Sequence, residues 1–103
     1  MSRIPQLLKM LESQPQDSFL KHALALEYLK EGSADKAREL FTALLAADPG
    51  YVGSYYHLGK IYEAEGNLQK ASETYEAGMK AAKAAGDRHA YNELQSVYEE
   101  LNY

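Results

Sequence analysis

Histidine is the residue of this sequence best suited to acid–base or metal chemistry, and it occurs three times, as His22, His57 and His89. A zinc site needs three or four ligands that converge at about 2 Å from the ion. Other parts of the chain are related by a spacing of 34 residues, but His22 and His57 are 35 residues apart. His22 therefore aligns with Tyr56, and the histidines do not occupy equivalent positions. We therefore predict no metal and no cofactor, and expect histidines that are solvated or line a groove.

Other constellations that could carry catalysis are missing from the sequence. There is no cysteine, which excludes a cysteine nucleophile, a thiolate metal site and disulfides. The G-x-S-x-G and H-E-x-x-H motifs and Gly-rich phosphate loops are also absent. The acidic pairs Glu63/Glu65 and Glu99/Glu100 are typical of solvated helix surfaces. We predict that the protein is not an enzyme.

Charge and hydropathy exclude two further classes of partner. The chain has 11 Lys and Arg against 15 Asp and Glu, interleaved, for a net charge of −4. Nucleic-acid binding needs a basic surface for the phosphates, so DNA and RNA are not expected as partners. No apolar run approaches the roughly 20 residues that span a bilayer. The charged N-terminal stretch and the lack of cysteine favour a protein of the cytoplasm.

Helix formers dominate the sequence, and Gly and Pro divide it into helix-sized pieces. The cuts fall at Pro15, Gly32, Pro49, Gly66 and Gly86. They predict helices over 3–13, 18–31, 34–47, 52–65, 68–85 and 88–103. The connections are only a few residues long, so neighbouring helices must pack antiparallel.

An internal repeat relates these pieces. A shift of 34 residues places Pro15 on Pro49, Leu24 on Leu58 and Tyr28 on Tyr62. The same shift places Gly32 on Gly66, Ala37 on Ala71 and Phe41 on Tyr75. So many matches at one offset, in helix-turn-helix units, indicate a repeat protein.

The repeat resembles the tetratricopeptide repeat, whose pattern is W-x2-L-G-x2-Y, then A-x3-F, then P. The residues of this chain that fit it best are Tyr55, Leu58, Gly59, Tyr62, Ala71 and Tyr75. Lys21 departs from the aromatic position, and Gln95 occupies a small-residue position in the last helix. The resemblance implies an all-α fold in which six helices form a right-handed superhelical stack.

The same resemblance implies one domain over 1–103. We divide it into an N-terminal half repeat (1–16), two whole repeats (17–50 and 51–85) and a C-terminal half repeat or capping helix (86–103). Stacked helix pairs create the core of such proteins, because one pair cannot bury both of its faces.

Tetratricopeptide repeats line a concave groove with the first helix of each pair, and this groove holds extended or helical peptides. The resemblance implies a protein-interaction module whose groove residues are Phe19, His22, Leu26, Leu29, Tyr56, His57, Lys60 and Asn92. The carboxylate clamp of chaperone-binding members is absent, because His22, Leu26 and His57 occupy its positions. An apolar or aromatic ligand is expected, and the sequence does not name the partner.

Two alternatives to a peptide groove stay open. The surface could be the exposed face of a scaffold, without a ligand. The protein could also associate with itself as a homodimer through terminal helices, for which Leu7, Leu11, Val97 and Leu101 are candidates.

Overall fold

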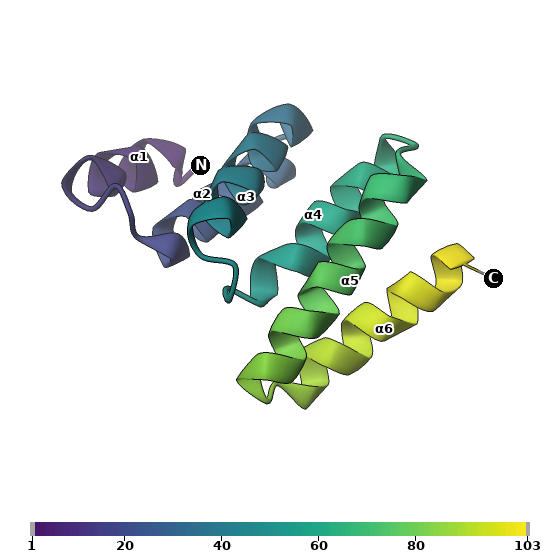
Figure 1. Ribbon diagram of the computed structural model, residues 1–103. Helices are drawn as coiled ribbons and strands as arrows, with labels where there is room; N and C mark the ends of the chain where they lie inside the picture. Colours follow the sequence, from purple (N-terminus) through teal and green to yellow (C-terminus); the bar gives the residue numbers. More distant parts are fainter. Residues whose placement is uncertain (1, 103) are drawn as a thin grey trace. The chain divides into compact units, whose positions relative to one another are not determined.

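The computed structural model describes residues 2–102, which form six α-helices and no strand (Figure 1). The helices are α1 (Ile4–Ser13), α2 (Ser18–Lys30), α3 (Ala34–Ala47), α4 (Gly53–Ala64), α5 (Leu68–Ala85) and α6 (Arg88–Asn102). Each lies within one residue of its predicted bounds; position 103, predicted to end the last helix, lies outside the described residues. The all-α fold and all five punctuation points are therefore confirmed.

Helices α2, α5 and α6 each begin after a residue whose side chain accepts a backbone N–H of the first turn. Asp17 caps α2 through the N–H of Leu20 at 2.9 Å, and Asn67 caps α5 through Lys70 at 3.1 Å. Asp87 accepts the N–H of Ala90 at 3.0 Å at the start of α6. These caps satisfy donors that have no partner within the helix, which fixes where each helix begins.

The 34-residue repeat of the sequence recurs in the geometry of the turns. Gly32 and Gly66 adopt left-handed φ angles of 79° and 78°, which a side chain would disfavour. The N–H of Ser33 reaches the carbonyl of Tyr28 at 2.8 Å, and that of Asn67 reaches Tyr62 at 2.9 Å. The two turns therefore end α2 and α4 in the same way.

A cation–π contact is repeated at the same offset. The Lys36 ammonium lies 5.3 Å from the centroid of the Tyr28 ring, and that of Lys70 lies 5.6 Å from the Tyr62 ring. Both pairs join the two helices of one hairpin across its turn. Such a contact contributes about 0.5–1 kcal/mol at an exposed site.

The chain divides into two compact units, one up to Asp48 and one from Pro49 onwards. Whether the chain folds as one domain, with the repeat boundaries given above, stays a prediction. In the first unit Leu7 of α1 is buried against Leu20 and Leu24 of α2. Ile4, Leu11, Ala23, Tyr28 and Leu40 pack around this cluster.

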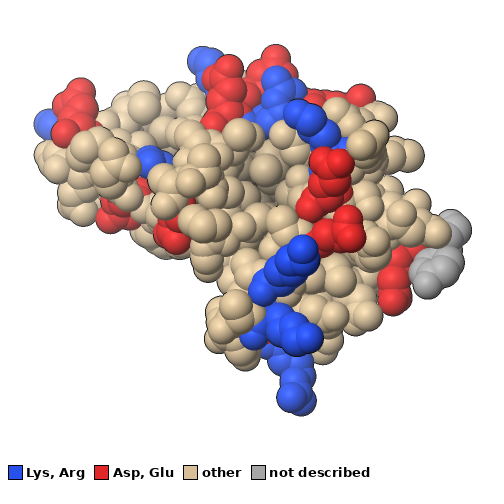
Figure 2. Space-filling model, in the orientation of Figure 1, with Lys and Arg blue, Asp and Glu red and all other residues tan. Residues whose placement is uncertain are grey.

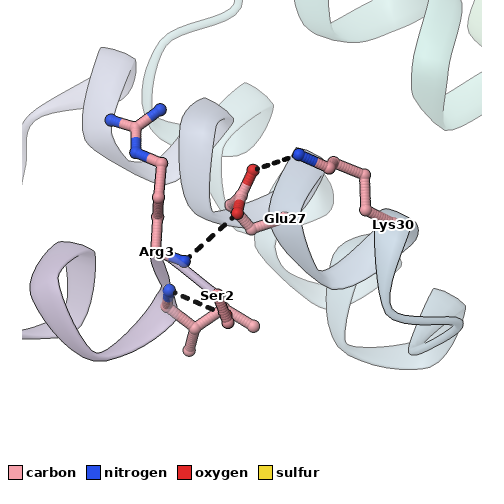
Figure 3. Close-up of polar contacts among 5 residues, drawn as sticks. Ser2, Arg3, Glu27 and Lys30 are labelled. Atoms are coloured by element: carbon pink, nitrogen blue, oxygen red, sulfur yellow. Dashed lines mark hydrogen bonds and ion pairs between the residues drawn. The ribbon is translucent and has the colours of Figure 1, made fainter.

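A buried carboxylate of α2 contacts the beginning of α1. Glu27 accepts the backbone N–H of Arg3 and the ammonium of Lys30, each at 3.3 Å (Figure 3). Arg3 precedes the first residue of α1, so the helix start is fixed to α2. The hydrogen bond from Arg3 is the main reason that the pKa of Glu27 lies below its usual value, and Lys30 lowers it further.

The second unit depends on two glycines without room for a side chain. A Cβ atom on Gly59 of α4 would lie 2.1 Å from the ring of Tyr75 on α5. A Cβ on Gly78 of α5 would lie 2.6 Å from the Cβ of Tyr55 and 3.0 Å from Leu94 of α6. Gly59, which fits the repeat pattern, is therefore a point of close crossing, and Gly78, which the sequence analysis did not single out, is a second one.

The aromatic residues of the repeats separate into two classes by burial. Phe41, Tyr55 and Tyr75 are buried. Tyr28, Tyr62, Tyr91 and Tyr98 are only half-buried.

The prediction that Leu7 and Val97 are exposed at the two ends of the array is wrong. Their side chains are 2% and 7% exposed, because both point into the core of their own unit. On α1 the exposed apolar side chains are instead Leu8 and Met10.

Candidate peptide-binding surface

The predicted groove residues of α2 form one stripe along the helix. Phe19, His22, Leu26 and Leu29 follow one another at intervals of three or four residues, which places them on one face. Leu20 and Leu24, which enter the core, lie on the opposite face. The Phe19 side chain is 63% exposed, and the other three are half-buried. We call these four residues the α2 stripe.

His22 is held in place within this stripe. Its ring packs edge-to-face on Phe41 of α3, with centroids 5.6 Å apart. Edge-to-face pairs of this kind add about 0.5–1.5 kcal/mol beyond the area that they bury. The His22 ring is therefore held in a fixed orientation and offers a partly apolar surface within the stripe.

The 34-residue offset carries the stripe onto α4, where the corresponding residues are Gly53, Tyr56, Lys60 and Glu63. We call these residues the α4 stripe. The Lys60 ammonium lies 3.6 Å from a Glu63 carboxylate oxygen and 5.9 Å from the centroid of the Tyr56 ring. The hydroxyl of Tyr75 donates to the same carboxylate. The charges of the α4 stripe are thus paired with each other.

Tyr75 has a structural role in this arrangement. Its ring is fully buried and fills the space beside Gly59, while its hydroxyl reaches Glu63. Burial, followed by the neighbouring Glu63 carboxylate, raises the pKa of the Tyr75 hydroxyl far above its usual value. The phenol therefore stays protonated and acts as a fixed donor.

His57 lies about 100° around α4 from Tyr56. Its ring is half-buried and lies edge-to-face with that of Tyr56, with centroids 5.8 Å apart. Burial lowers the pKa of His57, and the Glu93 carboxylate on α6 offsets part of this decrease. His57 is therefore neutral at pH 7. The role of Glu93 could not be predicted, because it depends on how α6 packs on α4.

Asn92 and His89 are exposed on α6. His89 lies 3.7 Å from a Glu93 carboxylate oxygen, one turn further along the helix. Residues 2–102 contain no group of three or more His, Asp or Glu side chains that could hold a metal ion. No helix in this range is long and apolar enough to span a bilayer.

Comparison with known proteins bears on what these surfaces are. The tetratricopeptide-repeat family model matches residues 28–97, which include the last turn of α2, all of α3, α4 and α5, and most of α6. The chain belongs to the tetratricopeptide-repeat family. Its resemblance to this family is thereby confirmed.

Relatives of this tetratricopeptide-repeat protein match nearly its whole length. It is 31% identical over 99 residues to the TPR repeat-containing protein PA0015 of Pseudomonas aeruginosa, a match that covers 96% of this chain and 94% of the relative. A crystal structure of a tetratricopeptide repeat domain protein from Salinibacter ruber is 41% identical, with a TM-score of 0.81, and the match covers 84% of this chain and 96% of that one. The solution structure of BPP2914 from Bordetella parapertussis is 27% identical, with a TM-score of 0.84, over 99% and 89% of the chains.

These matches establish the general role of the fold. Tetratricopeptide repeats are protein-interaction modules and are generally not catalytic, which agrees with the sequence prediction at this level. The names of these relatives specify no ligand.

Proposed function

We propose that this protein binds a peptide or helix of another protein through residues of the α2 stripe and of the α4 stripe. Apolar side chains of the ligand pack on Phe19, Leu26 and Leu29 of α2 and on Tyr56 of α4. Asn92 of α6 supplies an uncharged hydrogen-bonding group, and His57 contributes a neutral wall. Lys60 and Glu63 of the α4 stripe are paired with each other and flank these apolar contacts.

The observation that carries this proposal is that α2 is apolar on two opposite faces. One face enters the core through Leu20 and Leu24, and the other carries the α2 stripe with Phe19 largely exposed. A helix that is apolar on both sides gains stability when both sides are covered. Packing a leucine or an aromatic ring against a ligand contributes about 1.5–3 kcal/mol, which is enough for a binding hot spot.

The paired charges of the α4 stripe point to an apolar rather than an acidic ligand. Lys60 already contacts Glu63 and the Tyr56 ring, so a ligand carboxylate would have to compete with both. An exposed ion pair contributes only about 0–1 kcal/mol. We therefore expect peptide affinity to depend little on salt and mainly on buried apolar area.

The test begins with an unbiased peptide library displayed against the pure protein. Dissociation constants of a selected peptide are then measured by calorimetry for Leu26→Ala, Tyr56→Ala and the control Glu73→Ala on the exposed face of α5. Each stripe variant should bind about tenfold or more weakly, since 1.4 kcal/mol is a tenfold change. Equal affinity of all three variants, with unchanged melting temperatures, would show that the stripes are not the site.

We propose a cytoplasmic location as part of the same role. A chain without cysteine gains nothing from an oxidising compartment. Fractionation of the native cells with an antibody to the protein would place it, and recovery outside the cytoplasm would contradict the proposal.

Self-association is a second candidate function, and the C-terminal helix favours it. Tyr91 and Tyr98 are half-buried on the side of α6 where it meets α5, and they line hollows there. Light scattering at high micromolar concentration distinguishes a dimer from a monomer.

A further inference from the structure

A groove runs along the junction of α5 and α6. It consists of two adjoining hollows of about 400 Å³ and 280 Å³, which share Lys83 and Tyr91. The apolar part of the lining comes from Met79, Ala82, Tyr91 and Tyr98. We call this surface the α5–α6 groove. It lies within the second compact unit and includes neither the α2 stripe nor the α4 stripe.

Gln95 lies four residues after Tyr91 and three before Tyr98, so it shares the face of α6 that lines the groove, and its side chain limits what can pack there. Gln95 holds the position in α6 that Gly59 holds in α4. At Gly59 the second helix approaches so closely that a Cβ atom would lie 2.1 Å from Tyr75. A glutamine side chain prevents such a crossing, so a helix that packs here must stay at the more usual separation of about 8–10 Å.

Gln95 also suits one occupant in particular. A side-chain amide offers both donors and an acceptor, so two copies of it can hydrogen-bond to each other across a two-fold axis. A two-fold interface requires this kind of self-complementarity, because the same patch is used by both subunits. A second copy of this chain meets the requirement directly.

Charge is distributed along the groove in a way that favours an antiparallel pair. Lys80, Lys83 and Arg88 lie at the end where α5 turns into α6, whereas Glu76 lies further along the groove and Glu99 near the end of α6. Figure 2 shows this face, with blue side chains gathered over the turn and red ones over the middle of α5 and toward the end of α6. Rotation by two-fold symmetry brings the basic end of one copy to the acidic end of the other.

Helix geometry makes this pairing specific. With a rise of 1.5 Å per residue, Arg88 lies about 10 Å to one side of Gln95 and Glu99 about 6 Å to the other. An antiparallel partner centred on Gln95 therefore places its Glu99 within about 5 Å of Arg88 along the axis, which an arginine side chain can span. The same two-fold rotation places Tyr91 of one copy beside Tyr98 of the other. Their positions along the helix axis differ by only about 2 Å.

The geometry points to an antiparallel homodimer in which α6 of each copy packs along the α5–α6 groove of the other, with the two-fold axis at Gln95. The dimer rests on the self-association candidate and gives it a defined interface. Its interface uses no residue of the α2 stripe or the α4 stripe, so peptide binding and dimer formation are tested as separate properties.

The chain has no cysteine, so a single introduced cysteine can form a disulfide only with the same cysteine of another copy. Such variants test where the two-fold axis of the dimer lies. Gln95→Cys places a thiol on the two-fold axis, where it meets its own copy. The matched control is Ser96→Cys, an exposed neighbour about 100° around the same helix. Under mild oxidation Gln95→Cys should form a disulfide-linked dimer many times faster than Ser96→Cys. Equal cross-linking rates, or no cross-linking of Gln95→Cys, would overturn the proposal.

Charge exchange tests the antiparallel orientation without a cross-link. The dimer dissociation constant, measured by sedimentation equilibrium, should be about tenfold higher for Arg88→Glu or Glu99→Lys than for the wild type. Each substitution removes two ion pairs, because the two-fold interface contains the Arg88–Glu99 pair twice. The double variant Arg88→Glu with Glu99→Lys should restore dimerisation. Lys9→Glu and Glu12→Lys on α1 are the matched controls and should have no effect.

Two outcomes contradict the dimer and leave the peptide proposal intact. One is a wild-type protein that stays monomeric at high micromolar concentration, and the other is a dimer that the exchanged charges do not change. Circular dichroism of every variant should retain the helical spectrum. Conversely, loss of peptide binding in Leu26→Ala with dimerisation unchanged would separate the two properties.

Discussion

Gly59 of α4 packs directly against the ring of Tyr75 on α5. A Cβ atom on the glycine would lie 2.1 Å from Cε1 of that ring. Real Cβ atoms do not approach other atoms this closely. The ring itself cannot retreat, because it is fully buried and its hydroxyl is bound to Glu63. The spacing between α4 and α5 is therefore fixed by the absence of a side chain on α4.

The first prediction follows from this spacing. Gly59→Leu and Gly78→Leu should each lower the free energy of unfolding by about 1–3 kcal/mol or more, because the helices are forced apart. The control Lys80→Leu changes an exposed residue of α5 and should shift it by less than about 0.5 kcal/mol. Urea unfolding followed by circular dichroism measures all three, and equal midpoints would contradict the close packing.

Tyr75→Phe is the second prediction. The variant keeps the ring beside Gly59 but removes the hydrogen bond to Glu63, so unfolding should become easier by about 1–2 kcal/mol. Tyr98→Phe changes a half-buried tyrosine of α6 and serves as the control, with a much smaller expected effect. Thermal melts of the two variants distinguish them. A stability of Tyr75→Phe equal to the wild type would mean that the hydroxyl does not hold the carboxylate.

The third prediction concerns the attachment of α1. Glu27→Ala removes the acceptor of the Arg3 N–H, so the first turn of α1 should lose its link to α2. Hydrogen exchange should accelerate across α1, with α5 unchanged. Glu31→Ala, in an exposed residue just after α2, should leave the exchange of α1 as it is. Uniform acceleration over all helices would instead indicate global destabilisation.

Acid sensitivity of the fold is the fourth prediction. The pKa of His57 is below 6.5 in the folded protein, whereas it is about 6.5 in the unfolded chain. Below pH 6.5 the unfolded chain therefore binds a proton at His57 more readily than the folded protein does. Stability should therefore be complete above pH 6.5 and fall as the pH drops toward the folded-state pKa. His57→Gln should remove this part of the loss. Glu27 has its pKa lowered from 4.5, so its contribution is lost only at still lower pH.

Chemical denaturation at pH 7.5 and at pH 5.5 provides the comparison for His57. The difference in unfolding free energy between the two should be smaller for His57→Gln than for the wild type. His89→Gln is the control, because His89 is exposed on α6. A pH dependence that disappears in the His89 variant but not in the His57 variant would reverse the assignment.

Helix bounds were predictable from the sequence because they depend on local chemistry. Asp17, Gly32 and Asn67 act within their own turn, through a side-chain cap or a left-handed backbone. Such residues have few alternatives in any context. The 34-residue repeat then gave the antiparallel hairpins, and the close crossing at Gly59 followed from the family pattern.

The directions of individual side chains were harder to predict. Leu7 and Val97 were assigned to the exposed ends, but the helix phase turns both into the core. The effect of the Glu93 carboxylate on the pKa of His57 depends on how α6 packs on α4. No local sequence pattern specifies that packing. The pairing of Lys60 with Glu63 could have been anticipated from their spacing of three residues on one helix.

Most helix contacts within each unit join helices that are consecutive in the chain, α1 with α2, α2 with α3, α4 with α5, and α5 with α6, with a smaller contact between α4 and α6. Chains dominated by such short-range contacts close only small loops while folding, which typically takes microseconds to milliseconds. A hairpin can complete its turn, its cap and its cation–π contact before distant residues meet. An unfolded copy therefore exposes apolar segments such as that around Phe41 only briefly, which limits the time available for aggregation during synthesis.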